Sequence, residues 1–145
     1  MKTMLLTTLA LVALGSTLLF SNAVGLAQEP VGSRLNADFA RDVGHGCRYV
    51  ARFRGATLPA QNWSGTATEP EVAVVATLAC GKNPEVGVRD MLEGTGPLTD
   101  QQLLHALERR ATVTVPGLHG RCAYVPQLGF ENGFLVLKGV NTDCP

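Results

Sequence analysis

Four cysteines constrain the possible folds of this chain more than any other feature of its sequence. Cys47, Cys80, Cys122 and Cys144 all follow an amino-terminal segment that has the features of an export signal. An even number of cysteines in an exported chain is typical of disulfide bonds. The sequence therefore predicts two disulfides. A metal site is the weaker alternative, because the chain has no Cys-x-x-Cys or His-x-x-His spacing.

Residues 1–27 predict export of the chain. Met1-Lys2 is a basic start, residues 4–20 form an uncharged apolar run, and small residues then provide cleavage sites after Ala23 and Ala27. This order is typical of a secretory signal peptide. The apolar run is shorter than the roughly 20 residues of a membrane-spanning helix, so an uncleaved anchor is the weaker alternative. We therefore expect a secreted or periplasmic protein with no membrane insertion after cleavage.

The charge of the chain argues against two classes of protein. Its 12 basic side chains balance 12 acidic ones. Such a balance argues against a dedicated nucleic-acid-binding protein and against a polybasic protein of the membrane surface. We expect residues 28–145 to form a single globular domain that disulfides stabilise, because a chain of this length has a prior of one domain.

Two alternating segments predict a pair of strands. In residues 47–54, apolar side chains share one face and three arginines share the other. Residues 71–80 are apolar on both faces, as expected of a central strand. Antiparallel pairing of the two segments would bring Cys47 close to Cys80.

The segments around these strands predict less regular structure. Residues 55–70 and 81–97 contain Gly, Pro, Asn and Thr and predict loops. Residues 36–43 predict a short helix, with Asn36 as its cap and Gly44 at its end.

Residues 98–110 predict the main helix of the domain. Thr99 and Gln102 match a capping box, in which two side chains satisfy free backbone groups of the first turn. Leu103 and Leu107 belong to an apolar stripe that can pack on a sheet.

The carboxyl-terminal part predicts short strands and a hairpin. Residues 111–115 and 122–128 are strand candidates, and Asn132-Gly133 is typical of a two-residue hairpin turn. The register of this hairpin places Cys122 opposite residue 143, one position before Cys144. The expected fold is therefore of the α+β class, with a mostly antiparallel sheet of about five strands, one packed helix and two disulfides.

Two short segments, one in each half of the domain, are similar in sequence. His45-Gly46-Cys47-Arg48-Tyr49-Val50 is similar to His119-Gly120-Arg121-Cys122-Ala123-Tyr124-Val125. Each segment precedes an apolar strand, and each has one later cysteine. A degenerate duplication and chance both remain open, because the match covers few positions and needs a one-residue insertion.

The groups that could support catalysis do not form a recognisable motif. Ser33 and Ser64 lie outside any G-x-S-x-G elbow, and His105 lies on the solvated face of the predicted helix. His45 and His119 each lie at a strand entrance, where they could meet in space or stay apart. The sequence therefore predicts no catalytic residue, no metal site and no cofactor.

Two surface features are candidate binding residues. Arg48, Arg52 and Arg54 share a face that suits an anionic polymer or an acidic partner surface. The alternative is a charged face that protects a sheet from edge-to-edge aggregation. Trp63 lies in the predicted loop 55–70, where it could contact a partner or cover the core.

These observations predict a secreted, disulfide-stabilised binding protein without catalytic activity. The expected partner is an extracellular protein or a glycan, and nucleic acid is not expected. One alternative is an inhibitor of an extracellular hydrolase, which would present loop 55–70 or loop 81–97. Another is a small secreted hydrolase or toxin whose functional groups assemble only in three dimensions.

Overall fold

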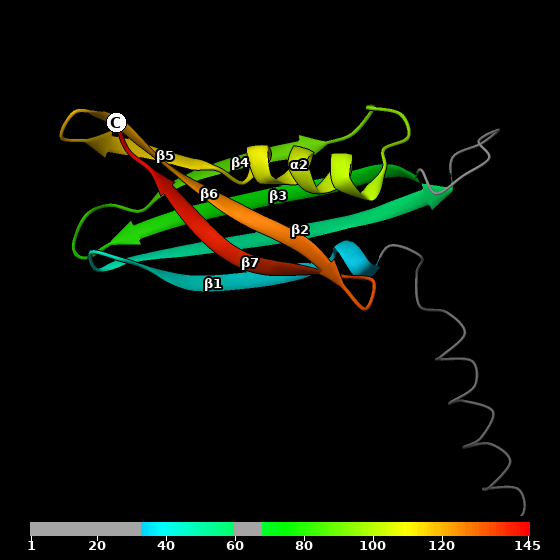
Figure 1. Ribbon diagram of the computed structural model, residues 1–145, viewed down its shortest axis with the longest axis horizontal. Helices are drawn as coiled ribbons and strands as arrows, with labels where there is room; N and C mark the ends of the chain where they lie inside the picture. The colour runs from blue at the N-terminus through cyan, green and yellow to red at the C-terminus, as the bar shows by residue number, and fades with distance from the viewer. Residues whose placement is uncertain (1–32, 60–67) are drawn as a thin grey trace, which may run out of the picture. The chain divides into compact units, whose positions relative to one another are not determined.

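The computed structural model describes residues 33–59 and 68–145 (Figure 1). Within these residues the strands form two antiparallel sheets, one of four strands in the order β1-β2-β3-β4 and one of three in the order β5-β6-β7. The helices are η1 (Ser33–Leu35), a short 3-10 helix, and α2 (Asp100–Arg110), which lies between the two sheets in sequence. The strands are β1 (Ala37–Gly44), β2 (Cys47–Pro59), β3 (Thr68–Cys80), β4 (Val86–Leu92), β5 (Val113–Gly117), β6 (Gly120–Glu131) and β7 (Phe134–Asp143).

The predicted fold class is confirmed in outline, since the strands are antiparallel and accompany one α-helix and two disulfides. The expectation of about five strands in one sheet is only roughly right. Two further strands, β1 and β4, form the two edges of the four-stranded sheet. Neither of them was predicted as a strand.

The predicted helix at residues 36–43 is wrong, because this segment forms β1. The Asn36 side chain does not cap a helix; its Oδ1 accepts a hydrogen bond of 2.9 Å from the backbone N–H of Gly55 in β2. Phe39 points to the core side, where its ring lies edge-to-face against Phe53 with centroids 6.0 Å apart. Pairing with β2 therefore outweighs the local helix signal.

The predicted loop at residues 81–97 is wrong in its centre, because β4 lies there. Val86 pairs with Leu78, and Leu92 pairs with Val72, so the whole of β4 pairs with β3 and forms the edge of the sheet. The glycines and the two prolines that suggested a loop lie mainly in the connections on either side of this strand.

A β-bulge interrupts the β6–β7 hairpin. Near the turn the strands pair in the predicted register, as far as Leu128 opposite Leu137. Gln127 then lies opposite Gly139, so Lys138 is an extra residue in β7. A bulge of this kind moves every later side chain of the strand to the opposite face.

The bulge explains why the predicted register misses the last cysteine by one position. An uninterrupted ladder would place residue 143 opposite Cys122. In the structure Ala123 lies opposite Asp143, the last residue of β7, and Cys122 and Cys144 are the adjacent residues. Their Cα atoms are 4.2 Å apart and their sulfurs are bonded, so the predicted disulfide is confirmed.

Arg41 connects the two sheets at this bulge. Its Nη1 donates to the carbonyl of Lys138 at 3.4 Å, and its Nη2 donates to the carbonyl of Leu137 at 3.3 Å. An edge strand leaves backbone carbonyls without a partner strand. The guanidinium therefore joins the edge of β1 to the edge of β7.

Helix α2 follows the sequence prediction closely. Thr99 Oγ1 accepts a hydrogen bond of 3.2 Å from the backbone N–H of Gln102, and Gln102 Oε1 accepts one of 3.0 Å from Thr99, so the capping box is present. Leu103, Ala106 and Leu107 are the buried residues of the helix. The apolar stripe thus packs against the sheets, as predicted.

Two hydrogen bonds, one buried and one partly buried, anchor the helix to both sheets. The Tyr49 hydroxyl of β2 donates to the carbonyl of Ala111 at 2.6 Å. The Glu108 carboxylate accepts a hydrogen bond of 2.8 Å from the backbone N–H of Leu128 in β6. The core between these elements is apolar. Its largest fully buried side chains are Tyr49, Phe53, Leu35, Leu78, Leu92, Leu103, Leu107, Val72, Val74, Val113, Pro70 and Pro126.

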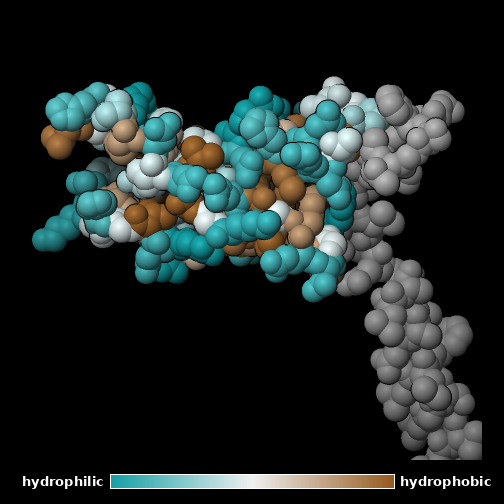
Figure 2. All heavy atoms as spheres, in the orientation of Figure 1, coloured by the Kyte–Doolittle hydropathy of each residue, from teal (hydrophilic) through white to brown (hydrophobic). Residues whose placement is uncertain are grey.

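Some apolar side chains also reach the surface. On the face drawn in Figure 2, hydrophobic groups appear between hydrophilic ones across the middle of the domain. Leu118, in the turn between β5 and β6, is 98% exposed. Among the described residues, no helix is both long and apolar enough to cross a membrane.

Candidate ligand-binding cleft

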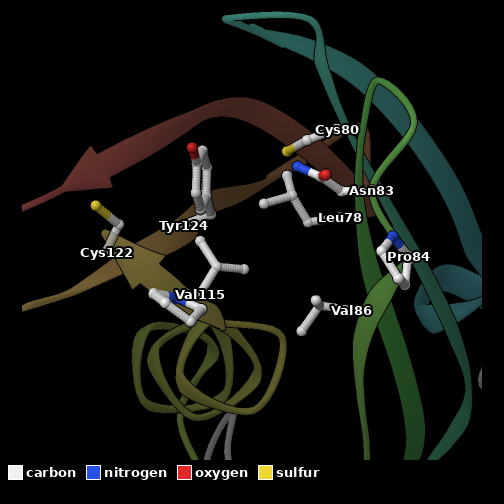
Figure 3. A pocket seen from close by; sticks show the side chains of 9 residues that line it. Leu78, Cys80, Asn83, Pro84, Val86, Val115, Cys122 and Tyr124 are labelled. Carbon is white, nitrogen blue, oxygen red and sulfur yellow. The ribbon is translucent and has the colours of Figure 1, made fainter. Parts of the chain in front are cut away.

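A cleft lies between the two sheets, where strands β3 and β4 face strands β5 and β6 (Figure 3). Its volume is about 500 Å³. The end of β3, the β3–β4 turn and the start of β4 form one wall, and β5 with the start of β6 forms the other. The cleft is lined by Leu78, Cys80, Asn83, Pro84, Val86, Val115, Pro116, Cys122 and Tyr124.

The cleft exists because α2 packs along only part of the space between the sheets. No residue of α2 is among those that line it. Solvent exposure therefore differs between the two ends of strand β4. Leu92 is fully buried, whereas Val86, which lies on the same face of the strand, is 39% exposed. The cleft therefore exposes an inward-facing apolar side chain that would otherwise belong to the core.

A disulfide stiffens each wall of the cleft. Cys47 and Cys80 lie directly opposite each other in the β2–β3 ladder, with Cα atoms 4.0 Å apart, as the sequence predicted. Cys80 lines one wall and Cys122 lines the other. Strand β3 is thus cross-linked to β2, and β6 is cross-linked to the residue that follows β7.

Two polar side chains interrupt the apolar lining. Tyr124 is only 8% exposed, and its hydroxyl donates no hydrogen bond to any other described residue. Asn83 extends from the β3–β4 turn toward the side of the cleft that carries Tyr124 (Figure 3). Its backbone N–H bonds to the carbonyl of Cys80 at 3.0 Å. The cleft therefore offers hydrogen-bonding groups but no charged side chain.

The predicted arginine face lies on the opposite side of the four-stranded sheet. There the arginines of β2 pair with carboxylates of β1. Arg48 lies 3.3 Å from Asp42, while Arg52 and Arg54 lie 3.1 and 2.8 Å from the two oxygens of Asp38. Asp42 with Arg48 and Asp38 with Arg52 are also direct neighbours in the ladder. Opposite charges in such cross-strand positions stabilise a sheet.

These ion pairs change the chemistry of the arginine face. A hydrogen bond from Arg54 holds the pKa of Asp38 below its ordinary value, and the charges of Arg54 and Arg52 act in the same direction. Asp38 is therefore ionised at neutral pH. Two carboxylates compensate three guanidinium groups, so the face is less basic than β2 alone indicates.

The other candidate residues lie at hairpin tips, on α2 or outside the described residues. Trp63 belongs to residues 60–67, which the structure does not describe, and β2 and β3 take up both ends of the predicted loop 55–70. His45, with a φ of 54°, lies in the turn between β1 and β2, and His119 lies in the turn between β5 and β6. Both histidines are exposed. Within the described part of the chain, no three His, Cys, Asp or Glu side chains are grouped so that they could hold a metal ion.

Comparison with known proteins assigns no class to this fold or to its cleft. No protein-family model, curated protein or solved structure matches the chain. The interpretation of the cleft therefore depends on its geometry and chemistry alone.

The residues of the cleft, apart from its two cysteines, were not among the candidates that the sequence indicated. They come from four strand ends that are distant in sequence, so no local motif marks them. Apart from the cysteines, the one sequence signal that involves the cleft is the similarity between residues 45–50 and 119–125, because it aligns Tyr124 with Tyr49. The two tyrosines have different surroundings, and only Tyr124 lines the cleft.

Proposed function

We propose that this protein is an exported, non-enzymatic binding protein whose cleft takes up a small, largely apolar ligand. The observation that carries this proposal is the cleft of about 500 Å³ between the sheets. Sites for small molecules are typically concave, mostly apolar and about 300–1,000 Å³ in volume. The signal-like leader and the two disulfides support export.

The exposure of the lining supports binding energetically. Val86 faces inward yet keeps 39% of its surface in contact with solvent. Removing apolar surface from water stabilises a complex by about 25 cal/mol for each Å². A ligand that covers Val86 and Val115 would gain this free energy without any rearrangement of the core.

The two disulfides support a preformed site. They join β3 to β2 and β6 to the residue after β7, and so stiffen the two strands that carry the lining residues Cys80 and Cys122. A site that is already ordered loses less conformational entropy when a ligand binds. The apolar lining also favours a small apolar molecule over the glycan that the sequence left open as a partner.

A charge placed in the cleft tests the proposal. Val86→Lys puts an ammonium group and its carbon chain at the cleft, whereas Val50→Lys makes the same change on the outer face of the same sheet. The two valines are 39% and 38% exposed, so they form a matched pair. Binding is measured by titration with the neutral fluorescent probe N-phenyl-naphthylamine, and thermal unfolding confirms that both variants are folded.

We expect saturable binding of one probe molecule to the unmodified protein. Val86→Lys should weaken this binding by about tenfold or more, because a charge in a desolvated apolar site is costly. Val50→Lys should leave the affinity unchanged. Absence of saturable binding, or equal losses in the two variants, would contradict the proposal.

A further inference from the structure

We infer that the ligand of this cleft is a neutral molecule with an apolar body and a single hydrogen-bonding oxygen, which the hydroxyl of Tyr124 recognises. This inference rests on the proposed function, since it names the class of ligand for the same cleft. It follows from the charge of the lining and from the position of one tyrosine hydroxyl that has no acceptor among the described residues of the protein.

The lining excludes a charged ligand. None of the nine lining residues has an ionisable carboxylate, ammonium or guanidinium group. An ion that leaves water for an apolar site without a partner of opposite charge loses far more free energy than a neutral group does. A fatty-acid carboxylate or a phosphate head group therefore has no partner in this cleft.

A comparison of two tyrosines identifies the recognition group. Tyr49 and Tyr124 each follow a disulfide-bonded cysteine by two residues. The Tyr49 hydroxyl donates to the Ala111 carbonyl at 2.6 Å. Tyr124 as a residue is also more than nine-tenths buried, but its hydroxyl has no such acceptor among the described residues and is not itself a buried atom. The Tyr124 hydroxyl is therefore free to donate a hydrogen bond to a molecule in the cleft.

A ligand oxygen is the partner that fits this position. Tyr124 lines the cleft together with leucine, valine and proline side chains, which cannot accept a hydrogen bond. A carbonyl or hydroxyl oxygen can accept one from the tyrosine hydroxyl. The Asn83 amide, which extends from the opposite wall, adds a second polar group (Figure 3). One polar head on an apolar body therefore matches the distribution of polar and apolar groups in the cleft.

Three probes of similar size test the inference. Naphthyl methyl ketone presents a carbonyl, ethylnaphthalene lacks it, and naphthoate replaces it with a charged carboxylate. Affinities are measured by competition with N-phenyl-naphthylamine. The variants are Tyr124→Phe, which removes only the hydroxyl from the cleft, and Tyr49→Phe, which removes the equivalent hydroxyl from the core.

We expect the unmodified protein to bind the ketone about fivefold to tenfold more tightly than ethylnaphthalene, the range expected for one hydrogen bond. Naphthoate should bind at least about tenfold more weakly than the ketone. Tyr124→Phe should abolish the preference for the ketone over ethylnaphthalene, because only the ketone accepts a hydrogen bond from the hydroxyl. Tyr49→Phe, measured under conditions in which this variant is folded, should retain the preference for the ketone over ethylnaphthalene.

The outcomes separate this inference from the proposed function. If no probe binds, the proposed function fails and the inference fails with it. If ethylnaphthalene binds as tightly as the ketone, or if the preference survives Tyr124→Phe, the inference alone is overturned. Tightest binding of naphthoate would also overturn the inference while leaving a binding cleft.

Discussion

Removal of one buried hydroxyl tests how the core of this domain is held together. Tyr49 is fully buried, and its hydroxyl donates a 2.6 Å hydrogen bond to the carbonyl of Ala111, where α2 ends. Tyr49→Phe keeps the ring and deletes the hydroxyl. The variant therefore loses the hydrogen bond and leaves the buried Ala111 carbonyl without this donor.

The expected loss of stability follows from the burial of both partners. Ala111 is also fully buried, so water cannot replace the lost donor. Removing one partner of a buried hydrogen bond costs about 1–3 kcal/mol. In a domain of this size, each kcal/mol lowers the thermal midpoint by about 4 °C. The matched control is Tyr124→Phe, whose hydroxyl donates to no described residue and whose loss should cost less than about 0.5 kcal/mol.

The same hydroxyl predicts a pH dependence. Burial raises the pKa of Tyr49 well above its ordinary value of 10.0. The folded state therefore keeps the proton at a pH at which the unfolded chain loses it. The contribution of Tyr49 is fully present below about pH 10 and then falls by about 1.4 kcal/mol for each pH unit.

Urea unfolding at about pH 8 and about pH 11 measures both effects. We expect the free energy of unfolding to differ between unmodified protein and Tyr49→Phe by about 1–3 kcal/mol at the lower pH. The difference should shrink by about 1.4 kcal/mol at the higher pH, because the variant has no phenol to ionise at this position. Equal losses in the Tyr49 and Tyr124 variants, or a constant difference across this pH range, would refute the reasoning.

Two further predictions concern the disulfides. Replacing Cys122 and Cys144 together by Ala should lower the free energy of unfolding by roughly 3 kcal/mol, and replacing Cys47 and Cys80 should cost slightly more, because sequence separations of 22 and 33 close loops of different length. Chemical denaturation measures both losses, and a loss below about 1 kcal/mol in either pair would argue against this account. The double substitution Asp143→Cys with Cys144→Ser moves the last thiol to the other face of β7. Mass spectrometry after alkylation should then find two free thiols, and a disulfide to Cys122 would show that the bulge does not fix the register.

The parts of the fold that the sequence predicted correctly are those with strong local signals. The capping box of Thr99 and Gln102 defines the start of α2 without help from the rest of the chain. The alternation in β2 and β3 brings Cys47 opposite Cys80, and the Asn132-Gly133 turn starts the β6–β7 register. Each of these features is marked by a pattern within one segment or in two segments that follow each other along the chain.

The parts that were missed depend on contacts between distant segments. Asn36 looks like a helix cap, but its side chain bonds to Gly55 in the neighbouring strand. The bulge at Lys138 occurs where Arg41 of another sheet donates to the carbonyls. The cleft is another such assembly, since it brings Leu78 of the first sheet together with Tyr124 of the second. Neither the hydrophobic periodicity nor the motif spacing of the sequence indicates that these distant segments come into contact.

The placement of the disulfides affects the range of ligand sizes that the cleft can accept. The Cys47–Cys80 bond joins two strands of the first sheet, and the Cys122–Cys144 bond joins β6 of the second sheet to the residue that follows β7. Neither bond crosses from sheet to sheet, so the aperture is set by packing and hydrogen bonds such as that of Arg41. Each sheet carries its own cross-link, but no disulfide joins the two sheets. A wider molecule can therefore be accommodated by spreading the sheets, at a cost in noncovalent contacts but without breaking a bond.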